Sequence, residues 1–372
     1  MLHNLKKIAK RRLYLVLIFP CLIWSNNYKE QPKDAQNDSL KKPKNIILLI
    51  GDGMGLSQVS SIYFDPNYTP NFNRFHTIGL ITVSSASELI TDSAAAATSF
   101  ASGEKTYNGA IGVNIDQEPL VTIVDLASDK QMKTGIISTS SITHATPACF
   151  YAHVEKRRMQ DEIATFLPVS DIDFFAGGGT DFFNNRKDER NLTEEFVQNG
   201  FTIDTTLVED YSKLKDSTKY GFLMAPNGMK SMIDGRGDFL PTSSALAIEY
   251  LSKSKDGFFL MIEGSQIDWG GHGNDGEYIK SEMLDFDQTI GKVLDFAKQD
   301  GNTLVIVTAD HETGGYTLTS NGSNYNEILP SFSTTGHSAT LIPVFAYGPG
   351  EEIFSGIYEN TEIFHKMKLL LE

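Results

Sequence analysis

Cysteine is nearly absent from this chain, as are membrane-length apolar runs and any excess of basic charge. Two cysteines, Cys21 and Cys149, occur in 372 residues, which excludes a small fold held together by several disulfide bonds. The apolar stretch from Leu13 to Trp24 is too short for a membrane-spanning helix. Acidic residues outnumber basic ones by 47 to 32, which argues against a nucleic-acid partner. We therefore expect a globular protein without a transmembrane span in its mature chain.

Residues 1–25 are typical of a secretory signal peptide, because five basic residues precede the apolar stretch. Without this segment the chain has 27 basic and 47 acidic residues and a formal charge of −20. We expect an exported protein, periplasmic or secreted. Cys21 raises the alternative of a lipoprotein, which Pro20 disfavours because small residues normally precede a lipidated cysteine. Residues 26–43 are polar and lysine-rich, which predicts a disordered leader.

Beyond residue 44, short apolar runs alternate with helical patterns. Strands are predicted at 44–50, 133–138 and 171–175, and further strands begin at 258 and 303. Helices are predicted at 93–100, 121–128, 159–166, 241–253, 280–299 and 359–371. This alternation predicts an α/β fold, doubly wound, with a mostly parallel central sheet and helices on both faces. Residues 44–372 are expected to form a single catalytic domain, with a small cap or insertion at about 184–238, where periodicity is weak.

Seven side chains suited to a two-zinc site stand at the ends of these predicted elements. Carboxylates and imidazoles collect at the carboxyl edge of an open α/β sheet when that edge holds metal. Asp268 and His272 are four residues apart, so one helical turn would place them on one face, with His337 as a third ligand. Asp310 and His311 follow a strand, and Asp52 could complete a second site. Two cations ~4 Å apart can hold the entering and leaving oxygens of a displacement at phosphorus.

Ser93, the seventh residue, has two interpretations. It opens an alanine-rich helical segment, where a serine commonly acts only as an N-cap. It could instead be a nucleophile, deprotonated by a zinc ion and assisted by the helix N-terminus. The two roles share a geometry, so this residue by itself does not decide between them.

Several longer motifs resemble those of alkaline phosphatases, and they occur in the family's order from about residue 44 to the C-terminus. They are Gly51-Asp-Gly-Met-Gly55, Asp92-Ser-Ala94, Lys105-Thr-Tyr-Asn-Gly109, Ala145-Thr-Pro147, Ala152-His-Val154, Glu263 through His272, Thr308-Ala-Asp-His311 and Thr335-Gly-His337. The chain is similar to the shorter bacterial members of cold marine type. The resemblance implies hydrolysis of phosphate monoesters at alkaline pH, with two zinc ions and one magnesium ion.

The resemblance also implies a role for each matching residue. Ser93 would attack phosphorus and form a phosphoserine, which water then hydrolyses. Asp268, His272 and His337 would hold the first zinc ion. Asp52, Asp310 and His311 would hold the second, and Asp52, Thr146 and Glu263 would hold magnesium, which prefers oxygen ligands. Arg157 would bind two phosphate oxygens through its guanidinium fork. The adjacent Arg158 is the alternative if the alignment slips by one residue.

Two positions depart from the best-known bacterial pattern. His144 replaces an aspartate near the magnesium site, and Trp269 replaces a lysine that contacts phosphate through water. The missing positive charge predicts weak phosphate binding and, where product release limits turnover, a fast enzyme. We also expect this enzyme to need added magnesium. His144 could bind the magnesium ion or could stand behind the ligands without touching it.

Three related activities and one unrelated function compete with this interpretation. A sulfatase would need Cys or Ser in a Cys/Ser-x-Pro-x-Arg setting, which the residues after Ser93 lack. Phosphodiesterases of this superfamily typically place threonine at the nucleophile; a cofactor-independent phosphoglycerate mutase is a further alternative. A non-catalytic protein that sequesters phosphate or metal would not need both nucleophile and ligands. Family resemblance also implies a homodimer that acts on small-molecule phosphate monoesters. The motif Arg236-Gly-Asp238 is short enough to occur by chance.

Overall fold

The computed structural model describes residues 40–207, 214–215 and 218–372. The predicted signal peptide at 1–25, including Cys21, and residues 26–39 of the predicted leader lie outside the described residues. The chain from Leu40 to Glu372 forms one compact unit. Leu40 packs against the hydrophobic core, and the Lys44 amide donates a 2.8 Å hydrogen bond to the Asn302 carbonyl. The last residues of the predicted leader therefore belong to the folded unit.

A ten-stranded sheet forms the centre of the described chain, in the order β14-β2-β13-β8-β1-β7-β3-β4-β6-β5. Only β13 runs antiparallel to its neighbours in this sheet. The strands are β1 (Asn45–Gly51), β2 (Thr77–Thr82), β3 (Lys133–Ser141), β4 (Phe174–Gly178), β5 (Phe201–Asp204), β6 (Lys219–Leu223), β7 (Phe258–Gly264), β8 (Thr303–Thr308), β13 (Ile342–Tyr347) and β14 (Gly356–Glu359). The central strands β1, β7 and β8 are buried along their whole length, as their continuous apolar runs predict. The predicted mostly parallel sheet is confirmed.

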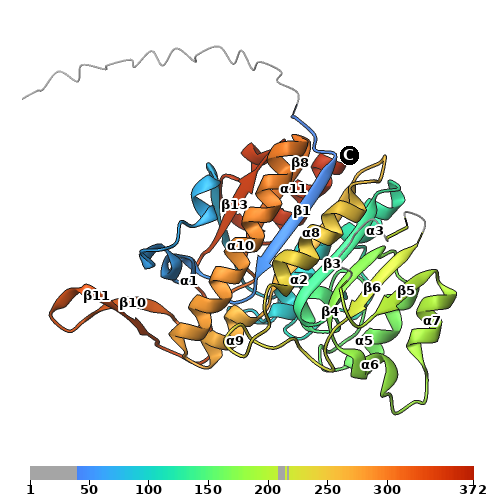
Figure 1. Cartoon of the computed structure of the whole chain (residues 1–372), viewed down its shortest axis with the longest axis horizontal. Helices are drawn as coiled ribbons and strands as arrows, with labels where there is room; N and C mark the ends of the chain where they lie inside the picture. Colours follow the sequence, from blue (N-terminus) through green and yellow to red (C-terminus); the bar gives the residue numbers. More distant parts are fainter. Residues whose placement is uncertain (1–39, 208–213, 216–217) are drawn as a thin grey trace, which may run out of the picture. The chain divides into compact units, whose positions relative to one another are not determined.

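Helices cover both faces of this sheet (Figure 1). α8 and α10 pack beside each other on one face, whereas α2, α3 and α11 pack together on the other. The helices are α1 (Leu56–Ser61), α2 (Ser93–Ser102), α3 (Ile123–Asp129), α4 (Ala145–Ala148), α5 (Gln160–Phe166), α6 (Thr180–Asn184), α7 (Leu192–Gln198), α8 (Phe239–Leu251), α9 (Gln266–His272), α10 (Gly276–Asp300) and α11 (Glu362–Leu371). Among the described residues, no helix combines the length and the apolar character needed to cross a bilayer.

Helix α2 begins and ends at residues that its sequence selects. The Asp92 carboxylate accepts a 3.0 Å hydrogen bond from the Ala95 amide and so caps the N-terminus. Gly103 ends the helix in the left-handed conformation, at φ 77°. All ten residues of α2 are buried, because the small alanines allow neighbouring helices to approach closely. This burial holds Ser93, the first helical residue, in one position.

Several shorter elements lie outside the central sheet. β9 (Glu312–Thr313) pairs with β12 (His337–Ser338), so that His337 lies opposite Thr313. Between them, β10 (Thr317–Asn321) and β11 (Asn324–Ser331) form an exposed hairpin that projects from the body of the folded unit (Figure 1). Short 3-10 helices lie at η1 (Ile62–Phe64), η2 (Asn71–Arg74), η3 (Leu167–Val169) and η5 (Glu351–Phe354).

Two local expectations differ in detail from the structure. The segment 184–238, expected as a small cap or insertion, includes β5 and β6, which extend the edge of the central sheet; these two strands are too short for a clear alternating pattern. The predicted helix at 359–371 begins three residues later, at Glu362, because β14 includes Glu359.

Candidate metal centre and nucleophile

The predicted site residues meet at the carboxyl ends of the central strands. Asp52 follows β1, Glu263 lies in β7, and α9 begins two residues after that strand. Asp310 and His311 follow β8, which pairs with β1 in parallel register. Because β8, β1 and β7 are adjacent and parallel, their carboxyl ends deliver these side chains to one edge of the sheet.

The first cluster consists of Asp268, His272 and His337. Their ligand atoms all lie within 4.8 Å of one another. The Asp268 carboxylate is 3.4 Å from His272 Nε2 and 3.6 Å from His337 Nε2, and the two imidazole nitrogens are 3.3 Å apart. Three convergent ligands with one open position are typical of catalytic zinc.

Backbone carbonyls orient both imidazoles of this cluster. The Nδ1 atom of His272 lies 2.6 Å from the Thr335 carbonyl, and that of His337 lies 2.9 Å from the Thr91 carbonyl. Because a carbonyl only accepts hydrogen bonds, Nδ1 carries a hydrogen in each ring, and Nε2 is directed into the cluster. The Asp268 carboxylate raises the pKa of His272 to about 9.

The second cluster consists of Asp52, Asp310 and His311, all fully buried. One oxygen of Asp310 accepts hydrogen bonds from the amides of Gly53 at 3.1 Å and His311 at 2.9 Å. Its other oxygen has no hydrogen-bond partner and lies 3.2 Å from His311 Nε2. Burial, followed by the charge of Asp310, raises the pKa of Asp52 well above its usual value. A cation at this cluster would relieve that repulsion.

Ser93 lies beside the second cluster, with its hydroxyl oxygen 3.3 Å from His311 Nε2. Its side chain is buried and does not cap α2, because Asp92 occupies the N-cap position. The alternative that Ser93 serves only as an N-cap is therefore wrong. Its hydroxyl stands at the positive end of α2, where developing negative charge is favoured.

Arg157 reaches the same region from the loop before α5. Its guanidinium donates a 3.0 Å hydrogen bond to the Asp92 carboxylate, and the two form an ion pair. Burial alone would lower the pKa of Arg157, but Asp92 raises it, so the side chain is charged. The adjacent Arg158 is exposed. The geometry thus brings Arg157, and not its neighbour, to the N-terminus of α2.

A third group lies behind the second cluster and consists of Asp52, His144 and Glu263. The hydroxyls of Ser138 and Ser265 donate hydrogen bonds of 2.5 and 2.6 Å to one oxygen of Glu263. The other Glu263 oxygen and the hydroxyl of the buried Thr146 have no hydrogen-bond partner. The structure therefore places the nitrogen of His144 together with the carboxylates predicted to bind magnesium.

Unpartnered buried atoms support the presence of cations at these clusters. Among the described residues, the buried side-chain atoms without a hydrogen-bond partner include both oxygens of Asp52, one oxygen each of Asp310 and Glu263, His144 Nδ1 and the Thr146 hydroxyl. Buried polar atoms normally have partners, because an unsatisfied one is costly. The first cluster, with two imidazoles and a carboxylate, suits zinc, and the second cluster also consists of ligand types that zinc accepts. The third group, where the Thr146 hydroxyl adds an oxygen to two carboxylates, suits a harder cation.

Asp92 and Thr313 belong to the site but carry no role in the sequence analysis. The Thr313 hydroxyl donates a 2.5 Å hydrogen bond to Asp268 and lies 3.2 Å from His311 Nδ1, so it connects the first two clusters. Asp92 precedes Ser93 directly, and Thr313 follows His311 by two residues. In the sequence, only their position beside Ser93 and His311 could have indicated a role, because aspartate and threonine are common residues with many structural functions.

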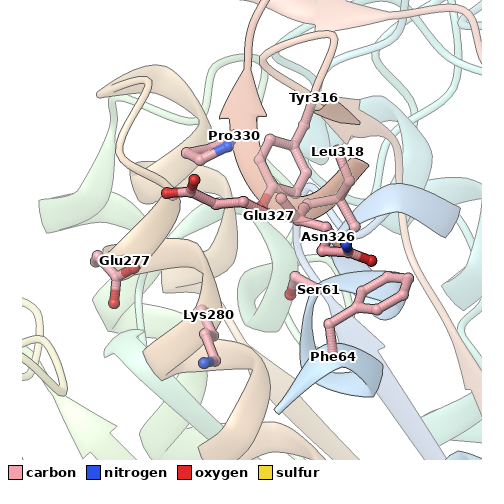
Figure 2. A pocket seen from close by; sticks show the side chains of 11 residues that line it. Ser61, Phe64, Glu277, Lys280, Tyr316, Leu318, Asn326, Glu327 and Pro330 are labelled. Atoms are coloured by element: carbon pink, nitrogen blue, oxygen red, sulfur yellow. The ribbon is translucent and has the colours of Figure 1, made fainter. Parts of the chain in front are cut away.

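Trp269 lies next to the third group, and a cavity lies apart from the candidate metal centre. The Trp269 ring meets the His144 ring edge to face, with centroids 6.2 Å apart. Elsewhere, a cavity of about 410 Å³ lies between α10 and the β10–β11 hairpin, and Figure 2 shows Lys280, Tyr316 and Glu327 on its wall. None of the clustered ligands lines that cavity, so it is distinct from the candidate metal centre.

Comparison with known proteins identifies the family. The sequence model of the alkaline phosphatase family matches residues 43–331 and 328–372. The chain belongs to the alkaline phosphatase family. Alkaline phosphatase 3 of Bacillus subtilis is 34% identical, with 96% of each chain covered. The solved alkaline phosphatase of the Antarctic bacterium TAB5 is 55% identical at a TM-score of 0.87, covering 89% of this chain and 98% of its own.

A second solved relative agrees with this assignment. The cold-active alkaline phosphatase of a Shewanella species is 30% identical at a TM-score of 0.80, covering 88% of this chain and all of its own. Two further TAB5 structures are of variants in which one histidine is replaced by aspartate or glutamate, with magnesium bound in a site named M3. The resemblance stated from sequence motifs is confirmed, and the chain is an enzyme of this family.

Proposed function

We propose that this enzyme hydrolyses phosphate monoesters to an alcohol and inorganic phosphate through a phosphoserine intermediate on Ser93. One observation carries the proposal: the buried Ser93 hydroxyl lies 3.3 Å from His311 Nε2, in contact with one ligand cluster and within the same site as the other. The names and similarity of the relatives support the reaction class. The nucleophile, the ligands and the metal count are our assignment.

The first and second clusters fit zinc, which accepts imidazole and carboxylate ligands. Asp268, His272 and His337 would hold one ion, and Asp52, Asp310 and His311 would hold the other. Bound there, two zinc ions would supply Lewis-acid stabilisation of the entering and leaving oxygens. The chain itself provides the buried setting and the oriented imidazoles, and α2 supplies its positive end to the nucleophile.

Arg157 is proposed to bind the substrate's phosphoryl group. A guanidinium fork matches two non-bridging phosphate oxygens, and a monoester has one more such oxygen than a diester. Asp92 holds the guanidinium from the side. This arrangement favours a monoester over a diester.

Asp52, Glu263, Thr146 and His144 are proposed to surround magnesium. The first three are the predicted oxygen donors, and the structure adds the nitrogen of His144 to the same group. Magnesium prefers oxygen, so a nitrogen at this place should weaken its binding. The TAB5 variants with an acidic residue in place of a histidine and magnesium bound in their M3 site support this interpretation. We infer that the enzyme requires added magnesium for full activity.

The decisive experiment compares a phosphate monoester with a matched diester at alkaline pH. Wild type and Ser93→Ala would be assayed after chelation and after zinc and magnesium are restored. We expect metal-dependent monoester turnover that falls by a factor of about 10³ or more in Ser93→Ala. Faster turnover of the diester would assign the chain to a phosphodiesterase activity. Absence of turnover on both substrates, with zinc bound, would leave a sequestering role.

Location and assembly are further proposals. The basic and apolar residues at 1–25 support export to the periplasm or beyond, and loss of this segment from the mature protein would be seen by mass spectrometry. A homodimer, proposed from the family, would appear in light scattering at twice the chain mass.

A further inference from the structure

Arg236 lies in the described chain as a fully buried cation. Its side chain is 0% exposed, and its guanidinium contacts Glu282 at 2.5 Å and Asp285 at 2.8 Å, each of which is 2% exposed. Both acidic residues belong to α10. The Arg236-Gly-Asp238 motif is therefore not a recognition sequence for a partner, because its arginine is unavailable at the surface. The guanidinium instead forms ion pairs inside the folded chain.

This ion-pair network holds the loop 224–238 against α10. Arg236 donates a 3.1 Å hydrogen bond to the Lys230 carbonyl, within the same loop. The Glu282 carboxylate that accepts from Arg236 also accepts a 2.8 Å hydrogen bond from the Met232 amide. A buried guanidinium shared by two carboxylates has little positional freedom, since moving it would leave charges unpaired. The loop's position is therefore tied to that of Arg236.

The first half of the same loop contacts two residues of α9, Gln266 and Trp269. The Gln266 side-chain amide donates 2.9 Å hydrogen bonds to the carbonyls of Thr139 and Met229, which joins the loop to the end of β3. Gly228 lies directly against Trp269: a Cβ atom at this glycine would be 2.8 Å from the indole carbon Cη2. The loop is therefore the wall on which the Trp269 ring rests.

Trp269 in turn contacts the residues near the phosphate and magnesium positions. Its ring meets His144 edge to face, and His144 Nε2 lies 3.5 Å from the Arg157 guanidinium. A continuous series of contacts thus leads from Arg236, through the loop and Trp269, to the group around His144.

We propose that Arg236 is a positioning residue for this site: its buried ion pairs with Glu282 and Asp285 fix the loop 224–238, which sets the place of Trp269 beside His144 and Arg157. The inference rests on the proposed function for its kinetic consequence. Its structural part, the link between Arg236 and the Trp269 ring, stands independently of which reaction the enzyme catalyses.

A tryptophan-fluorescence experiment tests the structural part. The chain has two tryptophans, Trp24 and Trp269, so a full chain with Trp24→Phe reports Trp269 alone. In this background, Arg236→Met is combined with Glu282→Gln and Asp285→Asn, which removes the ion pairs without leaving an unpaired buried charge. We expect a red-shifted emission and about threefold greater acrylamide quenching, because the wall behind the ring becomes mobile. Arg236→Lys, which keeps the charge but loses the fork, should show an intermediate change.

Kinetics test the functional part in the same variants. We expect KM for a phosphate monoester and the inhibition constant of inorganic phosphate to rise about threefold to tenfold, with a smaller change in kcat, because binding groups are displaced rather than removed. Gly228→Ala, which acts from the other side of the contact, should alter the same constants. The control is Arg74→Met, which breaks a 2.8 Å ion pair between η2 and Asp295 of the same helix α10 and should leave both fluorescence and kinetics unchanged.

Unchanged quenching in the triple variant would overturn the proposal, as would altered fluorescence with unchanged KM and phosphate inhibition. If the triple variant does not fold, Arg236→Lys and Gly228→Ala carry the same two readouts, and unchanged values in both would overturn it. Failure of the proposed function would appear differently, as absence of turnover in the wild type, with the fluorescence difference still measurable.

Discussion

Two carboxylates of the site, those of Asp310 and Glu263, form hydrogen bonds through one oxygen and leave the other oxygen without a hydrogen-bond partner. Asp310 uses one oxygen for two backbone amides, and Glu263 uses one for two serine hydroxyls. The remaining oxygens are buried without partners. Fixing half of each carboxylate orients the other half for a cation, so the ligands are already arranged before a metal arrives.

The Asp92–Arg157 ion pair gives a prediction about substrate affinity. Asp92→Asn keeps the oxygen that caps α2 but removes the charge that orients the guanidinium. We expect KM and the phosphate inhibition constant to rise about tenfold, since hydrogen bonds to charged groups contribute about 1.5–3 kcal/mol and this pair is partly exposed. Steady-state kinetics measure this change. Arg158→Met, at the exposed neighbour, is the control, and an equal effect there would contradict the assignment of Arg157.

His144 gives a prediction about magnesium. His144→Asp replaces a neutral nitrogen with a charged oxygen ligand beside Asp52 and Glu263. We expect the magnesium concentration for half-maximal activation to fall by a factor of about 10 or more. Magnesium titration of the zinc-loaded enzyme measures it, with zinc content checked as the control. An unchanged titration curve would show that His144 stands behind the ligands without touching the ion.

His272 gives a prediction about pH. Because Asp268 raises its pKa to about 9, the metal-free protein holds a proton on His272 below that pH, and zinc must displace it. Zinc affinity at this cluster should therefore increase about tenfold per pH unit up to about pH 9 and level off above it. Competition with a chelating dye between pH 7 and 10 tests the slope. A flat profile would mean that His272 is not a ligand.

At the scale of elements, the stability of α2 depends on the glycine at its C-terminus as well as on the aspartate that caps its N-terminus. Gly103 has φ 77°, and a Cβ atom there would lie 2.5 Å from the Phe364 ring of α11. Gly301 ends α10 at φ 71° with no atom within 4 Å of its hypothetical Cβ. The two glycines share the backbone requirement but differ in their neighbours.

Gly103→Ala should lower the free energy of unfolding by about 2–3 kcal/mol, against about 1 kcal/mol for Gly301→Ala. Both variants lose stability because alanine is strained in the left-handed conformation. The additional loss in Gly103→Ala comes from displacing the Phe364 ring and α11. Urea denaturation of both variants measures it. Equal losses would indicate that the Phe364 ring moves aside without cost.

At the scale of the whole molecule, the buried ligands concentrate negative charge at one edge of the sheet. Burial and the neighbouring carboxylates raise the pKa of Asp52, and burial raises that of Glu263 to about 7. Cations bound there would stabilise the folded chain by mass action, since the unfolded chain has no assembled site.

Chelation should therefore lower the midpoint of thermal unfolding by about 5 °C, corresponding to roughly 4 kcal/mol at this chain length. Scanning calorimetry before chelation, after it and after return of zinc and magnesium measures the effect. A midpoint that does not move, in protein shown to be free of metal, would contradict the proposed sites.

Much of this architecture follows from the sequence, because its signals are local. Strands β1, β7 and β8 are continuous apolar runs, and α10 has a clear amphipathic period. The family motifs predicted that Asp52, Asp268 and His311 bind metal in one site, and in the structure all three lie at one edge of the sheet. The edge strands β5 and β6 were missed, because short strands have little periodicity of their own.

The sequence by itself determined the fold class, the family and the residue types of the site, since apolar period and motif order are properties of the chain alone. The tertiary structure decided which atoms meet: that Asp92 rather than Ser93 caps α2, that His144 joins Asp52 and Glu263, and that the Arg236 guanidinium is buried on α10. These contacts join residues distant in sequence, or depend on side-chain direction, and both are set by how parallel strands and their helices pack.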